Sequence, residues 1–590
     1  MPSWAVSPES LASTALSVMT TLVVGPEDDG APRCDYLKLS ARRDARLAQL
    51  SQAPMVRIWD HQMRLVGQVQ VESLSADELL RDTGTCQFRF PLDSHVARWL
   101  RNGRRPDSDV HVTIDPIPTE RTWRDRWGGK ASLVSFIRAE DGREWCEVKA
   151  AHHFEHLKHI IYRNNPITPP EAQGVRFWLL PGPTRSVVYW TTLLALAQQF
   201  FPPLTLVDSF ADPLRWATIN PLDLSPLNWP VQPQFVNPLL DQSMFTVLTA
   251  SFQNAHAATA DVLKASGCHI RAYTWLPEDK DSPHPELEAL IGPLARPSRA
   301  CVVLACEDLS GVTGPTGTIF DSVLSFGAKL LDDSLTEVLL PLDLDGDGRT
   351  DPFFRALTLT APARPKVVFR DGDQTGVIES SYSHAPATAH TVSTGKGSPP
   401  LLNDGISFGV KYGLSRLQDL LQGGQLGGTW QVPGTPGLDE LYQGQLSNRF
   451  LTHKAWTDAL RALRSGDYAY IAAHEQSAVG YSVAGALAIQ SGLHKNRPRT
   501  TKHVRVRNGA PHWVGRDYTL GTRVLHEHGG VLFADQTGAL GIRMDPDGLV
   551  TRPVQIGEDD DEENPVASAL RAVQGIWGAI GAFGGADGGI

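Results

Sequence analysis

Cysteine is scarce in this sequence, and no two cysteines have the C-x-x-C spacing of a redox or metal-binding pair, since the 590 residues contain only six. Cys301 and Cys306 are the nearest pair, and they lie in the apolar run CVVLAC, which predicts small buried side chains. This usage argues against a disulfide-stabilised secreted domain and favours folding in a reducing compartment.

Long apolar runs are also missing. None approaches the roughly 18 residues that a membrane-spanning helix needs. The nearest candidate, Tyr189 to Phe201, contains two glutamines and predicts a buried helix. The opening residues MPSWAVSPES lack a basic region followed by an apolar core, so we expect no secretory signal peptide.

Positive charge is in short supply, because 54 Lys and Arg residues face 65 Asp and Glu residues and give a net charge of −11. The largest basic cluster, Lys495 to Arg507, alternates along a strand-like run, which is typical of a solvated face. We therefore expect no nucleic-acid binding site. Hydrophobic residues make up 41% of the chain, which excludes general disorder and predicts several folded domains.

Alternating apolar residues mark the β regions. On both sides of the turn Asp60-His61-Gln62, apolar residues alternate with polar neighbours, which predicts an antiparallel hairpin with one buried face. The apolar residues are Val56, Ile58, Met63, Leu65, Val69 and Val71. Cys86 to Phe90 predicts a further amphipathic strand, and Ala131 to Val148 a long β segment. Near the other end, Asn508-Gly509, Gly529-Gly530 and Asp547-Gly548 are hairpin turn signals within a second β unit.

Helical spacing predicts helices at Asp35 to Leu50, Ala151 to Arg163 and Ser186 to Phe201. From Ser243 to Pro277 the pattern is strand, helix and strand, with Gly267 ending the helix. Residues 202–238 contain eight prolines, which predicts an ordered but irregular connection.

These patterns together predict a multidomain protein of mixed α+β class. Its segments are a leader (1–50), a first β unit (51–150), a helical and proline-rich connection (151–240), a central α/β region with an acidic loop (241–400), a helical region (401–495), a second β unit (496–555), and an acidic linker with a C-terminal amphipathic helix (556–590).

The opening hairpin and the strand that ends at Pro91 resemble the first β-barrel of siphophage tail-tip hub proteins, which are minor tail proteins in phages of Actinobacteria. Four further stretches extend this resemblance over residues 55–550, and EDLSGVTGPTG is the most distinctive because it fixes many turn residues in one order. The stretches are Asp241-Gln242-Ser243 with the following strand-helix-strand, Glu307 to Gly317, Asn403 to Ile406, and Lys502 to Gln536.

The resemblance implies a structural, non-enzymatic protein of the virion tail tip, assembled in the host cytoplasm. It implies two hub-type β-barrel units and a homotrimer that closes the tail tube. Its partners would be the distal tail protein, the end of the tape-measure protein, other tail-tip proteins and, through host-attachment proteins, the host cell surface. The leader and the acidic tail depart from the family pattern.

The strongest local motif for a ligand is the run Asp343 to Asp351, DLDGDGRTD. Its carboxylates at Asp343, Asp345, Asp347 and Asp351, with Gly346 and Gly348 between them, suit a calcium loop of nine residues. Position twelve is Phe354 and not Glu, so a helix–loop–helix calcium site is excluded. The alternative is an acidic hairpin turn without metal.

Two other motifs resemble functional sites but have structural explanations. His152, His156 and His159 have zinc-compatible spacing if they lie on one helical face, but no cysteine pair accompanies them, which favours surface or interface histidines. Gly405 to Gly409 matches G-x-S-x-G in letters but falls within a predicted helix, where it is structural. The rival functions are a tail-associated cell-wall hydrolase and a glycan- or receptor-binding tip protein, for which fifteen tryptophans would provide contacts.

Two stretches are predicted to be mobile or ordered only by partners: the glycine-rich Gly423 to Gly437 and the acidic Glu558 to Glu563. Val566 to Phe583 has one apolar stripe at helical spacing, which predicts a helix that packs in a trimer or on a neighbouring tip protein. The rival is a membrane-active helix, which the preceding acidic run disfavours because anionic lipid would repel it.

Overall fold

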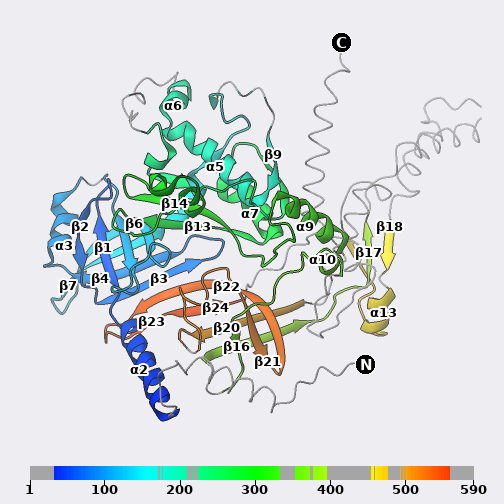
Figure 1. Cartoon of the computed structure of the whole chain (residues 1–590). Coiled ribbons are helices and arrows are strands. Elements are labelled where there is room, and N and C mark those ends of the chain that lie inside the picture. Colours follow the sequence, from blue (N-terminus) through cyan, green and yellow to red (C-terminus); the bar gives the residue numbers. More distant parts are fainter. Residues whose placement is uncertain are drawn as a thin grey trace, which may run out of the picture.

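The computed structural model describes residues 32–105, 107–170, 173, 175, 177–208, 216, 223–332, 353–372, 376–394, 454–457, 459–475, 492, 496, 499–509 and 511–557. Figure 1 shows three packed regions: a blue β unit from the N-terminal part of the sequence, a cyan-to-green α/β unit above it, and a largely orange β unit below. Helix α2 (Pro32–Leu50) projects from the body beside the β units, which confirms the predicted helix there.

The first β unit is an antiparallel arrangement of seven strands. In β4, every second side chain is buried, as the alternation of Cys86, Phe88 and Phe90 predicts. The hairpin of the first two strands is also confirmed, but the first strand is buried on both faces and not on one. The strands are β1 (Met55–Trp59), β2 (Leu65–Val69), β3 (Ser73–Leu79), β4 (Thr85–Pro91), β5 (His111–Asp115), β6 (Trp127–Arg138) and β7 (Glu144–His152).

Short helices α3 (His95–Arg98) and η1 (Trp99–Gly103) close one end of the first unit, and α3 packs on β2. The apolar core of the unit includes Phe88, Phe90 and Ile114, all fully buried. Ile542 and Met544, which come from the other end of the chain, belong to the same core. The first and last parts of the sequence therefore fold together.

The central unit has its own core, where helices cover one face of the sheet β10-β14-β13. Gly267, at φ 71°, ends α7 in the left-handed conformation that the sequence predicts. Its elements are η2 (His153–Glu155), α4 (His156–His159), β8 (Ile161–Tyr162), β9 (Trp178–Pro183), α5 (Thr184–Phe200), α6 (Pro202–Asp208), η5 (Pro226–Asn228), β10 (Val231–Pro233), β11 (Phe245–Ala250), β12 (Gln253–Asn254), α7 (Ala255–Ser266), β13 (Cys268–Trp275), α8 (Pro285–Ile291), η6 (Gly292–Ala295), β14 (Cys301–Asp308), α9 (Ile319–Leu331) and α10 (Phe353–Leu357).

Two predictions for this region need correction. The expected helix Ala151 to Arg163 is mostly wrong, because β7 continues to His152, where Ala151 pairs with Thr85 of β4, and β8 follows α4. The connection 202–238 is less irregular than predicted, because α6 begins at Pro202, and proline suits the first turn of a helix.

The C-terminal β unit surrounds a third core that includes Phe369, Val524 and Ile556. The predicted glycine turns are present, with Gly509, Gly529, Gly530 and Gly548 at positive φ. Its strands are β15 (Val368–Phe369), β16 (Val377–Ala385), β20 (Arg499–Arg507), β21 (Arg523–His528), β22 (Val531–Met544), β23 (Val550–Thr551) and β24 (Pro553–Ile556).

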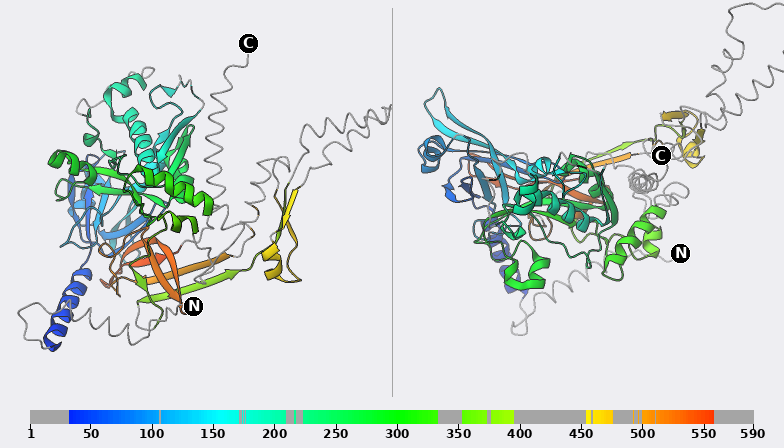
Figure 2. Two further views of the ribbon diagram at one scale, coloured as in Figure 1. Left: turned by 45° about the vertical axis from the view of Figure 1, so that its right-hand side comes forward. Right: turned by 90° about the horizontal axis from the view of Figure 1, so that it is seen from above.

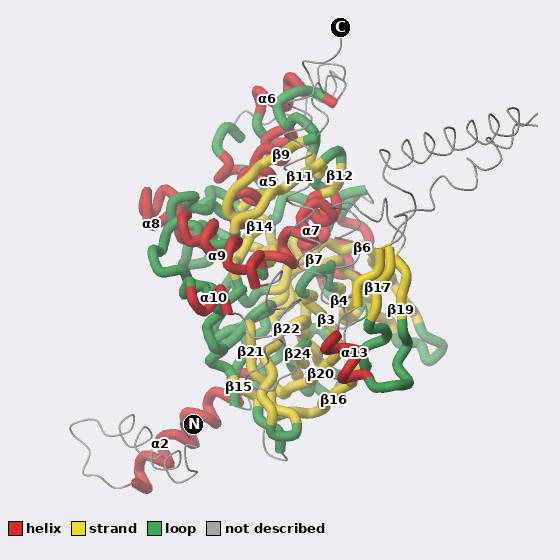
Figure 3. The backbone as a smooth tube through the Cα atoms, turned by 90° about the vertical axis from the view of Figure 1, so that its right-hand side faces the viewer, coloured by secondary structure: helices red, strands yellow, loops and turns green. Residues whose placement is uncertain are grey.

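One sheet of 14 strands unites the two β units, because β22 pairs with β3 in antiparallel register from Ala539–Leu79 to Met544–Leu74. Figure 3 shows β4, β3, β22, β24 and β20 following one another across the molecule. Among the described strands, β16 and β2 end the order of the sheet. The mixed α and β fold is thus confirmed, while closure of either unit into a barrel stays a prediction.

A small sheet of β17 (Thr391–Thr394), β18 (Lys454–Thr457) and β19 (Ala472–Glu475), with α13 (Ala459–Ser465), lies apart from the three cores. In both views of Figure 2 its yellow elements lie at one side of the body. Across the part of the chain that the structure describes, no helix has the length and apolar character to cross a membrane.

Candidate functional site

A chain of buried ion pairs joins the first β unit to the central unit. Arg126, immediately before β6, lies at its centre with a fully buried side chain. Its Nε donates to Asp115 Oδ1 at 2.8 Å, and its two terminal nitrogens donate to the carboxylate of Asp279 at 2.7 and 2.9 Å. Arg57 of β1 donates to the other oxygen of Asp115 at 2.7 Å and to Glu278 at 2.5 Å.

The charges of this network are balanced, because Arg121 also approaches Glu278, at 3.3 Å, and makes three arginines face three carboxylates. Burial lowers the pKa of the Arg126 guanidinium, but its bonds to Asp279 and Asp115 outweigh burial and hold that pKa above its ordinary value. Burial raises the pKa of Glu278, and Arg57 and Arg121 more than offset it. Since a buried charge without its partner is costly, the junction depends on its four buried members, Arg57, Arg126, Asp115 and Asp279.

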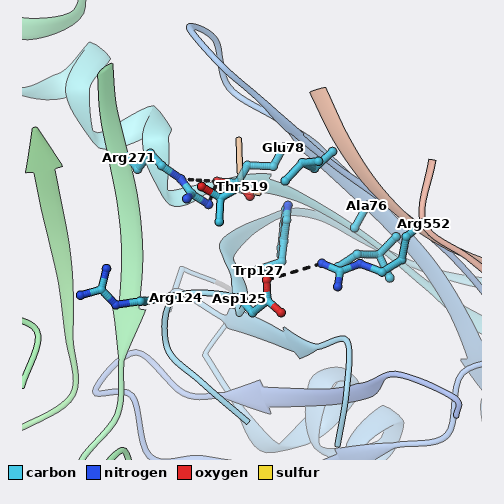
Figure 4. Close-up of a pocket in the computed structure, with 10 residues that line it drawn as sticks. Ala76, Glu78, Arg124, Asp125, Trp127, Arg271, Thr519 and Arg552 are labelled. Carbon is cyan, nitrogen blue, oxygen red and sulfur yellow. Dashed lines mark hydrogen bonds and ion pairs between the residues drawn. The ribbon is translucent and has the colours of Figure 1, made fainter. Parts of the chain in front are cut away.

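A second buried pair lies beside the first and connects β3 to β13. Arg271 donates from Nη2 to Glu78 Oε1 at 3.0 Å, and its guanidinium lies 4.8 Å from the ring centroid of Tyr273. The Tyr273 hydroxyl in turn donates to Glu307 at 2.7 Å. Burial raises the pKa of Glu78, and the nearby positive charge, chiefly that of Arg271, outweighs it and leaves the pKa lowered. Figure 4 shows the two side chains pointing toward each other beside a small cavity.

Close packing completes this junction. The rings of Trp123 and Tyr273 meet edge to face, with centroids 4.9 Å apart, and Trp275 belongs to the same buried cluster. Gly128 at the start of β6 lies so near Thr274 that an added Cβ would come within 1.9 Å of its Oγ1. The first β unit and the central unit are therefore held together by close packing as well as by ion pairs.

The residues predicted to bind calcium, Asp343, Asp345, Asp347 and Asp351, lie outside the described residues, as does Gly405 to Gly409. So do the loop Gly423 to Gly437, the acidic run and the terminal apolar stripe.

The three histidines predicted to share a helical face do not share one. His152 ends β7, where it is buried against Trp127, with ring centroids 5.4 Å apart, and accepts a bond from the Phe154 amide. His156 begins α4, and the His159 side chain is 75% exposed. Within the described part of the chain, no group of three or more His, Cys, Asp or Glu residues is arranged to hold a metal ion.

The structure instead brings together His111, His153 and His156. The centroid of the His153 ring lies 5.6 Å from that of His111 and 5.4 Å from that of His156. Burial lowers the pKa of all three, to about 4 for His156. These imidazoles are thus neutral at pH 7. The His153 side chain is buried, and those of His111 and His156 are partly buried.

The ion-pair network was missed from the sequence. Arg57 stands at a polar position of the alternating run MVRIW, which we expected to face solvent, but that face packs on the central unit. Its partner Glu278 is 221 residues away, and Arg126 and Asp279 are 153 residues apart. The one sequence signal for a buried ion pair was an arginine among the apolar residues of a strand. The carboxylates that pair with it follow no recognisable sequence pattern.

Exposed apolar side chains include three groups on outer parts of the molecule. Phe320 of α9 is 75% exposed, and Val323 and Leu324 lie on the same side of that helix. Phe353 and Leu357 of the adjoining α10 are also exposed. A third group, in the small sheet and its turns, comprises Trp456, Leu463, Tyr468, Tyr470 and Ile471. Such surfaces are typical of proteins that work in contact with other proteins.

Comparison with known proteins agrees with this description. The model of the family described as Siphovirus ReqiPepy6 Gp37-like protein matches residues 55–558. Minor tail protein Gp28 of Mycobacterium phage L5 is 27% identical over 616 aligned positions, which cover 93% of this chain and 98% of that protein. Minor tail protein Gp28 of Mycobacterium phage D29 is 25% identical, with the same coverage.

Among solved structures, a tail protein from Neisseria meningitidis MC58 aligns with 88% of this chain and 99% of its own, at 9% identity and a TM-score of 0.36. The match of the family model spans most of the chain and confirms the resemblance noted in the sequence. The chain therefore belongs to the Siphovirus ReqiPepy6 Gp37-like family of siphophage tail proteins.

Proposed function

We propose that this protein is a minor tail protein that forms the hub of a siphophage tail tip, where it closes the tail tube and seats the end of the tape-measure protein. The observation that carries the proposal is the family match over residues 55–558, together with two minor tail proteins that align along nearly their whole length. A location in the tail of the virion follows from the same matches.

The rigid junction supports a mechanical role. The 14-stranded sheet ties the first β unit to the C-terminal one, and the buried arginine–carboxylate network ties it to the central unit. A load applied to one unit is therefore passed to the other two through main-chain hydrogen bonds and buried ion pairs. This is the property that a plug at the end of a tube needs.

We further propose that three copies assemble around the tail axis, with both β regions contributing barrel-like units to one ring. Strands β16 and β2 end the sheet order, and exposed edges are readily paired or covered in an assembly. The distal tail protein and other tip proteins would contact the exposed apolar groups of α9 and α10. Reconstruction of the particle by electron microscopy should show three copies at the tip; one copy or six would contradict this assembly.

The rival function, a wall hydrolase or glycan-binding tip protein, is tested separately. Purified full-length protein should release no soluble fragments from dye-labelled cell walls and should not sediment with them. Lysozyme and a known wall-binding module serve as positive controls. Release of fragments, or retention on the walls, would favour the rival.

Calcium binding by Asp343, Asp345, Asp347 and Asp351 is proposed from the sequence alone. Isothermal titration of the full chain with calcium should show one site, which Asp345→Asn with Asp347→Asn abolishes. An unchanged titration curve in that variant would assign the binding elsewhere, and no heat with the native chain would exclude the site.

A further inference from the structure

A small cavity lies where the three units meet. Its volume is about 20 Å³, above the roughly 10–15 Å³ that one water molecule needs. Each unit contributes polar side chains to its wall: Glu78 from β3 and Asp125 and Trp127 from the first unit, Arg271 from the central unit, and Thr519 and Arg552 from the C-terminal unit. Figure 4 shows Arg552, which lies between β23 and β24, reaching toward Asp125 and Trp127.

Arg552 is the unusual member of this wall. Its side chain is only 8% exposed, and its ion pair with Asp125 is long, at 3.7 Å from Nη2 to Oδ1. Its Nε and Nη1 are buried and have no hydrogen-bond partner among the described residues. Buried donors of a charged group are costly to leave unbonded, so these two nitrogens call for an acceptor.

The charges around the cavity favour a negative acceptor over a neutral one. Arg271 is bound to Glu78, which leaves Arg552 as the second buried positive charge. Asp125 is 22% exposed and partly screened by solvent, so its charge offsets that of Arg552 incompletely. The exposed Arg124 also lines the cavity, but its guanidinium lies over the Trp123 ring and points away in Figure 4. The buried part of the wall thus carries two arginines against one glutamate.

We propose that this cavity binds a small monovalent anion, with chloride as the physiological example, held by the Nε and Nη1 donors of Arg552. The volume suits a single ion of this size. Because the three units each supply part of the wall, the ion stabilises their arrangement relative to one another. The bound ion contacts all three units at their junction, and its binding free energy adds to the stability of the folded protein.

The test uses the full-length protein and the midpoint of its thermal unfolding. Chloride is raised at the expense of gluconate, at constant ionic strength. The midpoint of the native chain should be constant at low chloride and rise with the logarithm of the chloride concentration once this exceeds the dissociation constant. Arg552→Gln should remove this rise. Asp125→Asn removes the opposing charge and should lower the chloride concentration at which the rise begins by about tenfold. Arg543→Gln is the matched control, because Arg543 lies on β22 beside Asp77 at 3.6 Å and is 49% exposed.

A direct measurement covers the case in which Arg552→Gln fails to fold. Crystals of the native protein grown in sodium bromide should give an anomalous peak within hydrogen-bond distance of the Arg552 guanidinium. No such peak, or an equal chloride response in native protein and Arg552→Gln, would overturn the proposal and assign the cavity to water.

Discussion

The first β unit is joined to the rest of the protein along two seams that use different chemistry. The main-chain seam, between β3 and β22, consists of six paired residues that link it to the C-terminal unit. The side-chain seam, centred on Arg126, links it to the central unit through buried charges. One depends on backbone groups that every residue except proline carries, and the other on a few named side chains.

This difference sets what each seam tolerates. At the main-chain seam the size of the side chain is constrained. Gly541 pairs with Asp77 of β3, and a side chain at this position would meet Asp77 and Pro553. At the side-chain seam the constraint is on charge, because each carboxylate there has an arginine as its partner. Substitutions on the two seams should therefore lower the free energy of unfolding for different reasons and by different amounts.

The largest effect is expected at the centre of the side-chain seam. Arg126→Met keeps the apolar stem but leaves Asp115 and Asp279 buried without their main partner, so the free energy of unfolding should fall by about 3–5 kcal/mol. Urea unfolding of the full chain measures it. The matched control is Arg505→Met, which breaks the exposed pair with Glu379, where both side chains are more than 40% exposed, and should cost under about 1 kcal/mol. Equal losses in the two variants would mean that burial adds nothing to this network.

A smaller loss is expected at the main-chain seam. In Gly541→Ala the added Cβ would lie 2.6 Å from the Pro553 ring, which is closer than packing allows. The strands must shift, at a cost of about 1–3 kcal/mol. The same unfolding experiment detects the loss, and hydrogen exchange should speed up in β22 and β24 but not in β13. An unchanged hydrogen-exchange rate in β22 would show that the strands accommodate the added methyl group without losing stability.

Lowering the pH should destabilise the protein through the cluster of His111, His153 and His156. The folded-state pKa of His156 is about 4, below the ordinary value, so the unfolded chain binds protons first as the pH falls. The stability is fully present above about pH 6.5 and is lost below it, by about 2 kcal/mol at pH 5 for this residue alone. Lys130 and Asp109, which face the cluster, are already paired with each other at 2.9 Å.

His156→Gln should flatten this pH dependence between pH 6.5 and 5, measured as the urea midpoint at each pH. His159→Gln, at an exposed position of the same helix, should leave the curve as it is in the native chain. A native curve that is flat over this range would contradict the assignment of neutral buried imidazoles.

The smallest effect should have the opposite sign and lie away from both seams. Gly327 is inside α9, and a Cβ added there meets no atom within 4 Å. Gly327→Ala should stabilise the protein by about 0.5–1 kcal/mol, because alanine loses less backbone freedom in a helix. A destabilised variant would mean that this face of α9 is in contact with another part of the chain.

Local patterns in the sequence predicted the elements that local forces decide. The turn at Asp60 to Gln62, the alternation in β4 and the left-handed Gly267 each depend on neighbours a few residues away. The helix predicted at Ala151 failed because pairing with Thr85 of β4 outweighed local preference. The ion-pair network could not be predicted from the sequence, because nothing near Arg126 indicates that its partner Asp279 lies 153 residues further along the chain.

The pairing of β3 with β22 has a consequence for the order of events during synthesis. Leu79 leaves the ribosome 460 residues before its partner Ala539. At roughly 5–20 residues per second, the edge of β3 waits about 20–90 s for the strand that will cover it. During that interval a growing chain presents a bare strand edge to every neighbour, and other nascent copies on the same message carry the same edge. Production of this protein is therefore expected to depend on a host chaperone that shields the N-terminal half until the last strands arrive.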